Sequence, residues 1–187
     1  MVTSSTIIKF QEMEFISFYE ILPNIAEKQT RHVTMINDKD VPAGEYAFMD
    51  VHCADKTCDC RRIFINVLQI HPDYEPRNVA FISYGWEPMS FYRNWSRGLS
   101  NEMLVNFKGP CLDAYQRQSP DAPYFLAFFK NMIAAEPAYI NRLKKHYALF
   151  KWRIGMKLPK DMPFDPDMHC PCGSEKKFKF CCGKKNQ

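Results

Sequence analysis

The sequence is poor in glycine, with seven among 187 residues. The phosphate-binding patterns G-x-x-x-x-G-K-S/T and G-x-G-x-x-G do not occur, so nucleotide-binding loops are not expected. The hydrolase pattern G-x-S-x-G and the zinc-enzyme patterns H-E-x-x-H, H-x-E and P-C-x-x-C are missing too. These absences leave the commonest classes of hydrolase and zinc deaminase without support.

The sequence also lacks any run of about 18 apolar residues, which argues against a membrane-spanning helix. The first residues, MVTSSTIIKFQEME, do not contain the basic and then apolar segments of a secretory signal peptide. We therefore expect a cytoplasmic protein with no membrane partner.

Cysteine is the most informative residue type that is present. Clustered cysteines in a reducing compartment indicate metal ligands or catalytic thiols rather than disulfides. Seven of the eight fall into two clusters, and Cys111 stands apart. The clusters are Cys53, Cys58 and Cys60 near the middle, and Cys170, Cys172, Cys181 and Cys182 near the end.

The fold class indicated by the sequence is α+β, with a small antiparallel sheet packed against helices. Hydrophobic residues make up 46% and aromatic residues 14% of the chain, enough for a buried core. Alternating or apolar stretches joined by short connections favour antiparallel strands. The expected strands are 31–37, 45–53, 60–71 and 77–86. The expected helices are 10–22 (ended by Pro23), 88–96, 101–108 (with Ser100 as N-cap and Gly109 as the stop), 121–135 and 137–154. In the last helix Ile140, Leu143, Tyr147 and Phe150 form one apolar stripe.

Three parts are expected along the chain. Residues 1–156 form the α+β body with the cysteine cluster at 53–60. Residues 157–168, KLPKDMPFDPDM, hold three prolines and are predicted to be a linker. Residues 169–187 form a small cysteine-rich tail. The tail holds five lysines and one acid, whereas the rest of the chain holds 20 basic and 20 acidic residues. A basic tail suggests an acidic partner surface, such as a protein, the ribosome or a nucleic acid.

The tail pattern predicts a zinc site. Zinc favours four soft ligands in a tetrahedron, and Cys170-x-Cys172 followed by Cys181-Cys182 supplies four thiolates. The tail has too few apolar residues to build a core of its own. Metal binding, worth about 10–16 kcal/mol in small zinc modules, would supply its folding free energy. A disulfide between the adjacent Cys181 and Cys182 would be strained.

The segment CPCGSEKKFKFCCG resembles the SEC-C motif, the zinc-binding tail of the SecA translocation motor. The family pattern is roughly CPCGSGKKYKKCHG or a variant ending in CCG. This chain departs at Glu175, where Gly is usual, and at Phe178, where Tyr is common, and Cys182 stands where His is frequent. The resemblance covers about 15 residues and implies a zinc module that binds partners such as a chaperone or the ribosome. It does not imply an enzyme.

The body resembles bacterial SEC-C proteins of unassigned function more loosely. The segments that carry this resemblance are VHCADKTCDCRRIFINV, SYGWEPMSFYRNW, KGPCLDAYQRQSP and YINRLKKHYALFK. This second resemblance brings no activity with it.

The cluster Cys53-x4-Cys58-x-Cys60 lies between two predicted strands and is one ligand short of a closed zinc site. A second structural zinc is the favoured interpretation, and the remaining ligand could be His52, Asp55, Asp59 or Cys111. Reduced thiols without metal, or an open catalytic zinc, are the alternatives. Glu45, Asp50 and His52 are the candidate titratable partners for an open site. Arg61 and Arg62 either compensate thiolate charge or face water at a strand edge.

We therefore expect a zinc-binding protein whose tail binds a macromolecular partner, a protein or the ribosome, with no catalysis. One alternative is a nucleic-acid-binding protein that uses the lysine-rich tail and the basic helix 137–154. The other is a zinc-dependent enzyme that uses Cys53, Cys58 and Cys60. His32 and His146 have no evident partner and are expected to be structural or surface residues.

Overall fold

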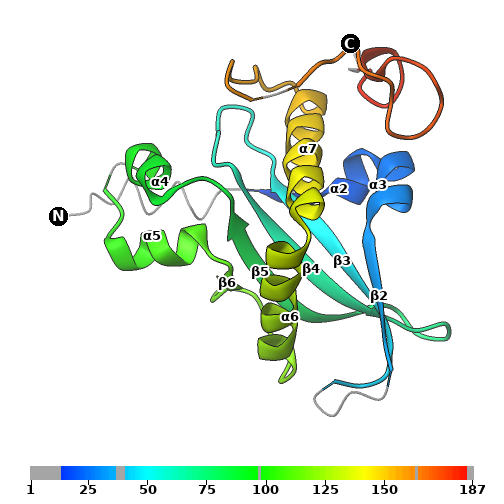
Figure 1. Ribbon diagram of the computed structural model, residues 1–187, viewed down its shortest axis with the longest axis vertical. Coiled ribbons are helices and arrows are strands. Elements are labelled where there is room, and N and C mark those ends of the chain that lie inside the picture. The colour runs from blue at the N-terminus through cyan, green and yellow to red at the C-terminus, as the bar shows by residue number, and fades with distance from the viewer. Residues whose placement is uncertain (1–13, 37–40, 97, 163, 185–187) are drawn as a thin grey trace.

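A computed structural model describes residues 14–36, 41–96, 98–162 and 164–184. The architecture is α+β, with a six-stranded antiparallel sheet and helices packed on it (Figure 1). In chain order the elements are β1 (Phe15–Ser17), α2 (Phe18–Ile21), α3 (Pro23–Gln29), β2 (Arg31–Met35), β3 (Gly44–Cys53), β4 (Arg62–Ile70), β5 (Arg77–Gly85), α4 (Met89–Ser96), α5 (Asn101–Lys108), β6 (Cys111–Leu112), α6 (Ala122–Ala135), α7 (Pro137–Arg153) and the 3-10 turn η1 (Phe178–Phe180). The predicted fold class and antiparallel pairing are confirmed.

The sheet is built around β3, β4 and β5, which pair as consecutive antiparallel neighbours. β1 and β2 both pair with β3 but at opposite ends, β1 with Val51–Cys53 and β2 with Gly44–Phe48. In the β3–β4 pair, His52 lies opposite Ile63, so the turn at 54–61 is held between two strand ends. The first cysteine cluster therefore starts from a fixed position in the sheet.

The main core lies between the sheet and the helices α6 and α7, which run along one face of it (Figure 1). Phe125 and Phe129 of α6 are fully buried, and so is Tyr147 of α7. Three of the four stripe positions predicted for 137–154 are buried, whereas Ile140 is half-buried. At the far end of the sheet, Ser100 caps α5 by accepting a hydrogen bond from the Met103 amide, as predicted.

Of the helix predicted over 10–22, only Phe18–Ile21 is helical, as α2, and residues 10–13 lie outside the described residues. Phe15–Ser17 form β1 instead. Ser17 then caps the short α2 with Glu20 in a capping box, and Pro23 starts α3 rather than ending a helix. Local capping and the proline preference for a first helical turn outweigh the apolar spacing on which the prediction depended.

After α7 the described residues of 157–168 contain no helix or strand, yet several of them contact the rest of the protein. Asp161 binds Arg61, Met162 packs on the main core, and the ring of Phe164 lies 5.3 Å from that of Trp152. The boundaries at 156 and 168 stay predictions. Among the described residues, no helix is long and apolar enough to cross a membrane.

Candidate metal centres

The tail brings its four cysteines together, with all four sulfur atoms within 4.8 Å of one another. The Sγ atoms of Cys172 and Cys181 are 3.6 Å apart, and those of Cys181 and Cys182 are 4.0 Å apart. A tetrahedron with zinc–sulfur bonds of about 2.3 Å has edges of about 3.8 Å, whereas a disulfide needs about 2.05 Å. The spacing therefore fits a shared metal ion and does not fit a disulfide.

The backbone of the tail forms the cradle for these sulfurs. The Cys170 amide donates to the Lys176 carbonyl at 2.8 Å, which closes the loop between the two cysteine pairs. Two residues of this loop have left-handed backbone conformations, Gly173 at φ 80° and Glu175 at φ 61°. Glu175 thus occupies a conformation that favours glycine, which is the residue usual at this position of the motif that the tail resembles.

The tail is anchored to the body through Phe178, whose side chain is fully buried. It belongs to a second core that also holds Phe18 and Leu22 from the N-terminal segment and Leu149 and Phe150 from α7. Figure 1 shows the tail beside α3 and the end of α7. In addition, Lys28 of α3 donates a hydrogen bond to the carbonyl of Cys172. The tail lacks its own core, as predicted, but it shares one with the body.

The electrostatics of the tail favour at least one thiolate without a metal. The side chain of Ser174 lowers the pKa of Cys172 to about 6, and the Cys170 thiol contributes to this effect. Burial raises the pKa of Cys170. Lys177 and Lys179 form ion pairs with Asp167, at 2.7 and 2.9 Å.

The second cluster joins Cys53 at the end of β3 with Cys58 and Cys60 in the turn before β4. The three sulfur atoms also lie within 4.8 Å of one another. Cys53 is 0%, Cys60 2% and Cys58 9% exposed, so the cluster is almost closed to solvent. The chain therefore presents three convergent thiol ligands in an interior position.

None of the four residues proposed as a further ligand belongs to this group of described residues. His52 points elsewhere, because neighbouring residues of a strand face opposite sides. Asp55 accepts hydrogen bonds from the amide and hydroxyl of Thr57, both at 2.7 Å. Asp59 binds Arg61 and Tyr147, and the Cys111 sulfur lies 3.0 Å from the Asn106 carbonyl. All cysteines and histidines of the sequence are among the described residues, so neither residue type completes the cluster.

Three cations surround the turn that carries the cluster. Arg61 binds Asp59, Glu87 and Asp161 at 3.2, 3.1 and 2.8 Å. Arg62 donates to the Ser83 hydroxyl at 2.9 Å and lies 3.9 Å from Asp113. Both arginines are more than nine-tenths buried, so the alternative that they face water is wrong.

Lys151 is the third cation, and sequence reasoning missed it. Its side chain is fully buried, and its Nζ donates to the carbonyls of Cys53 and Asp55 at 2.8 and 2.9 Å. The signal was available, because Lys151 lies four residues after Tyr147 and therefore falls on the apolar stripe of α7.

The pKa values of the three thiols are shifted in different directions. Hydrogen bonds from Cys58 and Cys60 lower the pKa of Cys53, and Lys151 adds to the shift. The same hydrogen bonds to Cys53 raise the pKa of both Cys58 and Cys60. The cluster thus favours one thiolate on Cys53 when no metal is bound, with the other two thiols as its donors.

Beside the cluster lies a buried polar network that includes His52. The Oδ2 atom of Asp50 is 2.7 Å from His52 Nε2 and 3.0 Å from His146 Nδ1, and His146 Nε2 is 2.9 Å from Gln29 Oε1. Burial opposes ionisation of Asp50, but His146 and His52 hold its pKa well below its usual range. The ring of Phe18 stacks on His146 at 4.1 Å. His146 is therefore a buried structural residue, one of the two possibilities expected from the sequence, and its partners Asp50 and Gln29 were not predicted.

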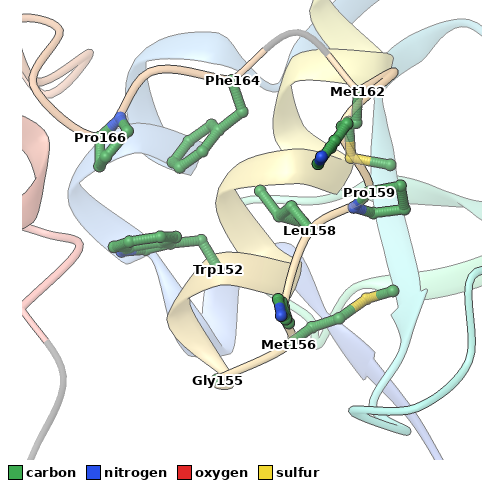
Figure 2. A pocket seen from close by; sticks show the side chains of 10 residues that line it. Trp152, Gly155, Met156, Leu158, Pro159, Met162, Phe164 and Pro166 are labelled. Atoms are coloured by element: carbon green, nitrogen blue, oxygen red, sulfur yellow. The ribbon is translucent and has the colours of Figure 1, made fainter.

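A hollow of about 440 Å³ lies between the end of α7 and the segment that follows it (Figure 2). Its walls are mainly apolar, and Lys157 and Lys160 are its charged members. No carboxylate is among the residues that line it. These residues are Trp152, Gly155, Met156, Lys157, Leu158, Pro159, Lys160, Met162, Phe164 and Pro166.

Comparison with known proteins finds no relative for this chain. No protein-family model, no curated protein and no solved structure matches it. The likeness of residues 170–183 to the SEC-C motif therefore stays a resemblance, and the two sulfur clusters carry the functional argument.

Proposed function

We propose that this protein binds zinc at both cysteine clusters and uses its tail to bind a macromolecular partner, a protein or the ribosome, without catalysing a reaction. The observation that carries the proposal is the spacing of the tail cysteines, with sulfur–sulfur distances of 3.6 and 4.0 Å. Four convergent thiols are typical of closed structural zinc sites, and thiolate ligands favour zinc over harder divalent ions.

The outward face of the tail supports a binding role. Lys176 and Lys184 are exposed, and Phe180 is 67% exposed although Phe178, two residues before it, is fully buried. The ammonium group of Lys179 lies 4.9 Å from the centre of the Phe180 ring. An exposed aromatic ring among lysines suits a partner that presents acidic and apolar groups together.

The absence of catalysis is proposed because the reactive groups near the body cluster are committed to other contacts. Asp50 and His52 bind each other in the interior, and Glu45 lies at the opposite end of β3. The three cysteines of the cluster are at most 9% exposed, which leaves little access for a substrate.

The nucleic-acid alternative has weaker support from the charges along α7. Lys144 and Lys145 line a second hollow, of about 480 Å³, but Glu87, Asp161 and Asp165 line it as well. Carboxylates at these positions would repel phosphate groups.

The test measures zinc content and partner capture on the same samples. We expect a zinc-to-protein ratio near two by elemental analysis. The double variant Lys176→Glu/Lys184→Glu and the variant Phe180→Ala should keep both ions and lose captured protein or ribosome in a pull-down. The matched charge control is Lys144→Glu/Lys145→Glu, at two exposed positions of α7, and this variant should capture normally. Removal of residues 165–187 is avoided, because it would expose Phe18 and Phe150.

Equal capture by the wild-type protein and both tail variants would refute the binding role of the tail. Capture of protein-free RNA or DNA that falls steeply between low and high salt would favour the nucleic-acid alternative. A ratio near zero would refute zinc binding altogether.

A further inference from the structure

The buried charge of Lys151 needs a counter-charge. Its side chain is fully buried in the last turn of α7. It has no carboxylate within 4.0 Å in the part of the chain that the structure describes. An ammonium group in a protein interior is strongly disfavoured unless it is paired and hydrogen-bonded. Two carbonyl oxygens satisfy two of its three donors but do not supply a full negative charge.

The neighbouring cations are already balanced. Arg61 contacts three carboxylates and Arg62 lies near the carboxylate of Asp113. The sulfur cluster remains as a source of negative charge for Lys151, which donates directly to the carbonyl of Cys53.

We propose that Lys151 supplies the charge that balances a divalent ion bound by Cys53, Cys58 and Cys60, and that the remaining ligand of this ion is neutral. Three thiolates and one divalent ion leave a single net negative charge, which one ammonium group neutralises. A fourth thiolate or a carboxylate would leave the buried site charged. Asp55 and Asp59, the nearest carboxylates in sequence, are bound to Thr57 and to Arg61. Lys151 is thus a positioning residue for the metal, and water is the simplest neutral ligand.

This inference rests on the proposal that the body cluster binds metal, and it separates the two sites by their chemistry. The tail site has four thiolates, whereas the body site has three thiolates and a neutral donor. Cadmium-113 bound in place of zinc gives one NMR resonance for each site. A four-thiolate site resonates at higher frequency than a site in which oxygen replaces one sulfur.

The decisive variant is Lys151→Met. The matched control is Lys145→Met, which changes an exposed lysine of the same helix. We expect Lys151→Met to weaken zinc binding at the body site about 10- to 100-fold, as loss of outer-sphere partners commonly does. The resonance of the tail site and partner capture should not change. Lys145→Met should leave both affinities as in the wild-type protein.

A second measurement distinguishes charge balance from a simple structural role. Lys151→Met removes the hydrogen bonds to the carbonyls of Cys53 and Asp55 with or without metal, so charge balance predicts a larger loss of stability to urea in the zinc-loaded protein than after removal of metal with a chelator. If Lys151 only holds these carbonyls, the loss of stability will be equal in the two states and the zinc affinity unchanged. That result would overturn the proposal.

Two further results would also overturn it. Loss of the body ion in Asp55→Asn or in Asp59→Asn, with the fold kept, would identify a carboxylate ligand. A wild-type zinc ratio of one, with the ion retained when Cys58 is changed to Ser, would remove the second metal and this inference together. The binding role of the tail would then still stand, since pull-down variants at Lys176, Lys184 and Phe180 test it separately.

Discussion

The contact between Phe178 and the body gives the sharpest test of how the tail is held. Its ring is fully buried and meets that of Phe164 edge-on, with centroids 5.9 Å apart and planes at 89°. The same core includes residues of the body, among them Phe18 and Phe150. Truncation of a buried phenylalanine to alanine costs about 3–5 kcal/mol. In a chain of this length each kcal/mol lowers the melting temperature by about 2–4 °C.

We therefore expect Phe178→Ala to melt roughly 6–20 °C below the wild-type protein when both are zinc-loaded. Unfolding of the body is followed by far-ultraviolet circular dichroism, and release of the tail ion is followed with a coloured chelator. Because the second core joins the tail to α2 and α7, both signals should shift together. Phe180→Ala is the matched control, since that ring is 67% exposed and its loss should cost less than about 0.5 kcal/mol.

A different outcome would refute this reasoning. If zinc release moves to lower temperature while the body melts as in the wild-type protein, the tail folds on its own and the shared core contributes little. The predicted linker over 157–168 would then separate two independent units. Equal effects of Phe178→Ala and Phe180→Ala would mean that the buried position of Phe178 is not maintained in solution.

Three further predictions concern the polar network and the tail loop. Asp50→Asn should lower the free energy of unfolding by about 3–5 kcal/mol in a urea titration, because it leaves two buried histidines without their carboxylate. Burial lowers the pKa of His52, so at mildly acidic pH this histidine binds a proton in the unfolded chain but not in the native protein. Stability should therefore fall as the pH drops below about 6.5, and His52→Gln should flatten this slope in thermal melts. Glu175→Gly should relieve the left-handed strain at φ 61° by about 0.5–1 kcal/mol, seen as roughly two- to fivefold tighter zinc binding at the tail in a chelator competition.

The central strands and the later helices were predictable because their signals are local. Residues 45–53 alternate, 60–71 are apolar on both faces, and only short segments join them. Ser100 and Gly109 mark the ends of α5 by their own backbone chemistry. Each of these elements lies within a few residues of its predicted bounds. β6 was missed because a two-residue strand has no period to detect.

The side-chain contacts that sequence reasoning missed join residues that are distant in sequence. His146 meets Asp50 across 96 positions, and Lys151 meets Cys53 across 98. A basic residue at the end of a helix ordinarily faces solvent, and this expectation outweighed the local signal, which is the place of Lys151 on the apolar stripe four residues after Tyr147. The cysteine groupings could be predicted because their members are close in sequence. That no fourth ligand for the body cluster is found among the described residues depends on tertiary geometry instead.

The last two turns of α7 connect the two sulfur clusters. Tyr147 donates from its hydroxyl to Asp59 in the body turn, and Lys151 holds the carbonyls on either side of Ala54. Between them, Leu149 and Phe150 face the second core, to which the tail contributes Phe178. The turn at 54–61 and the tail both reach this helix with little regular structure of their own. A metal ion in each would fix these stretches where neither a strand nor a large apolar surface does so, and both ions would then stabilise the same helix end.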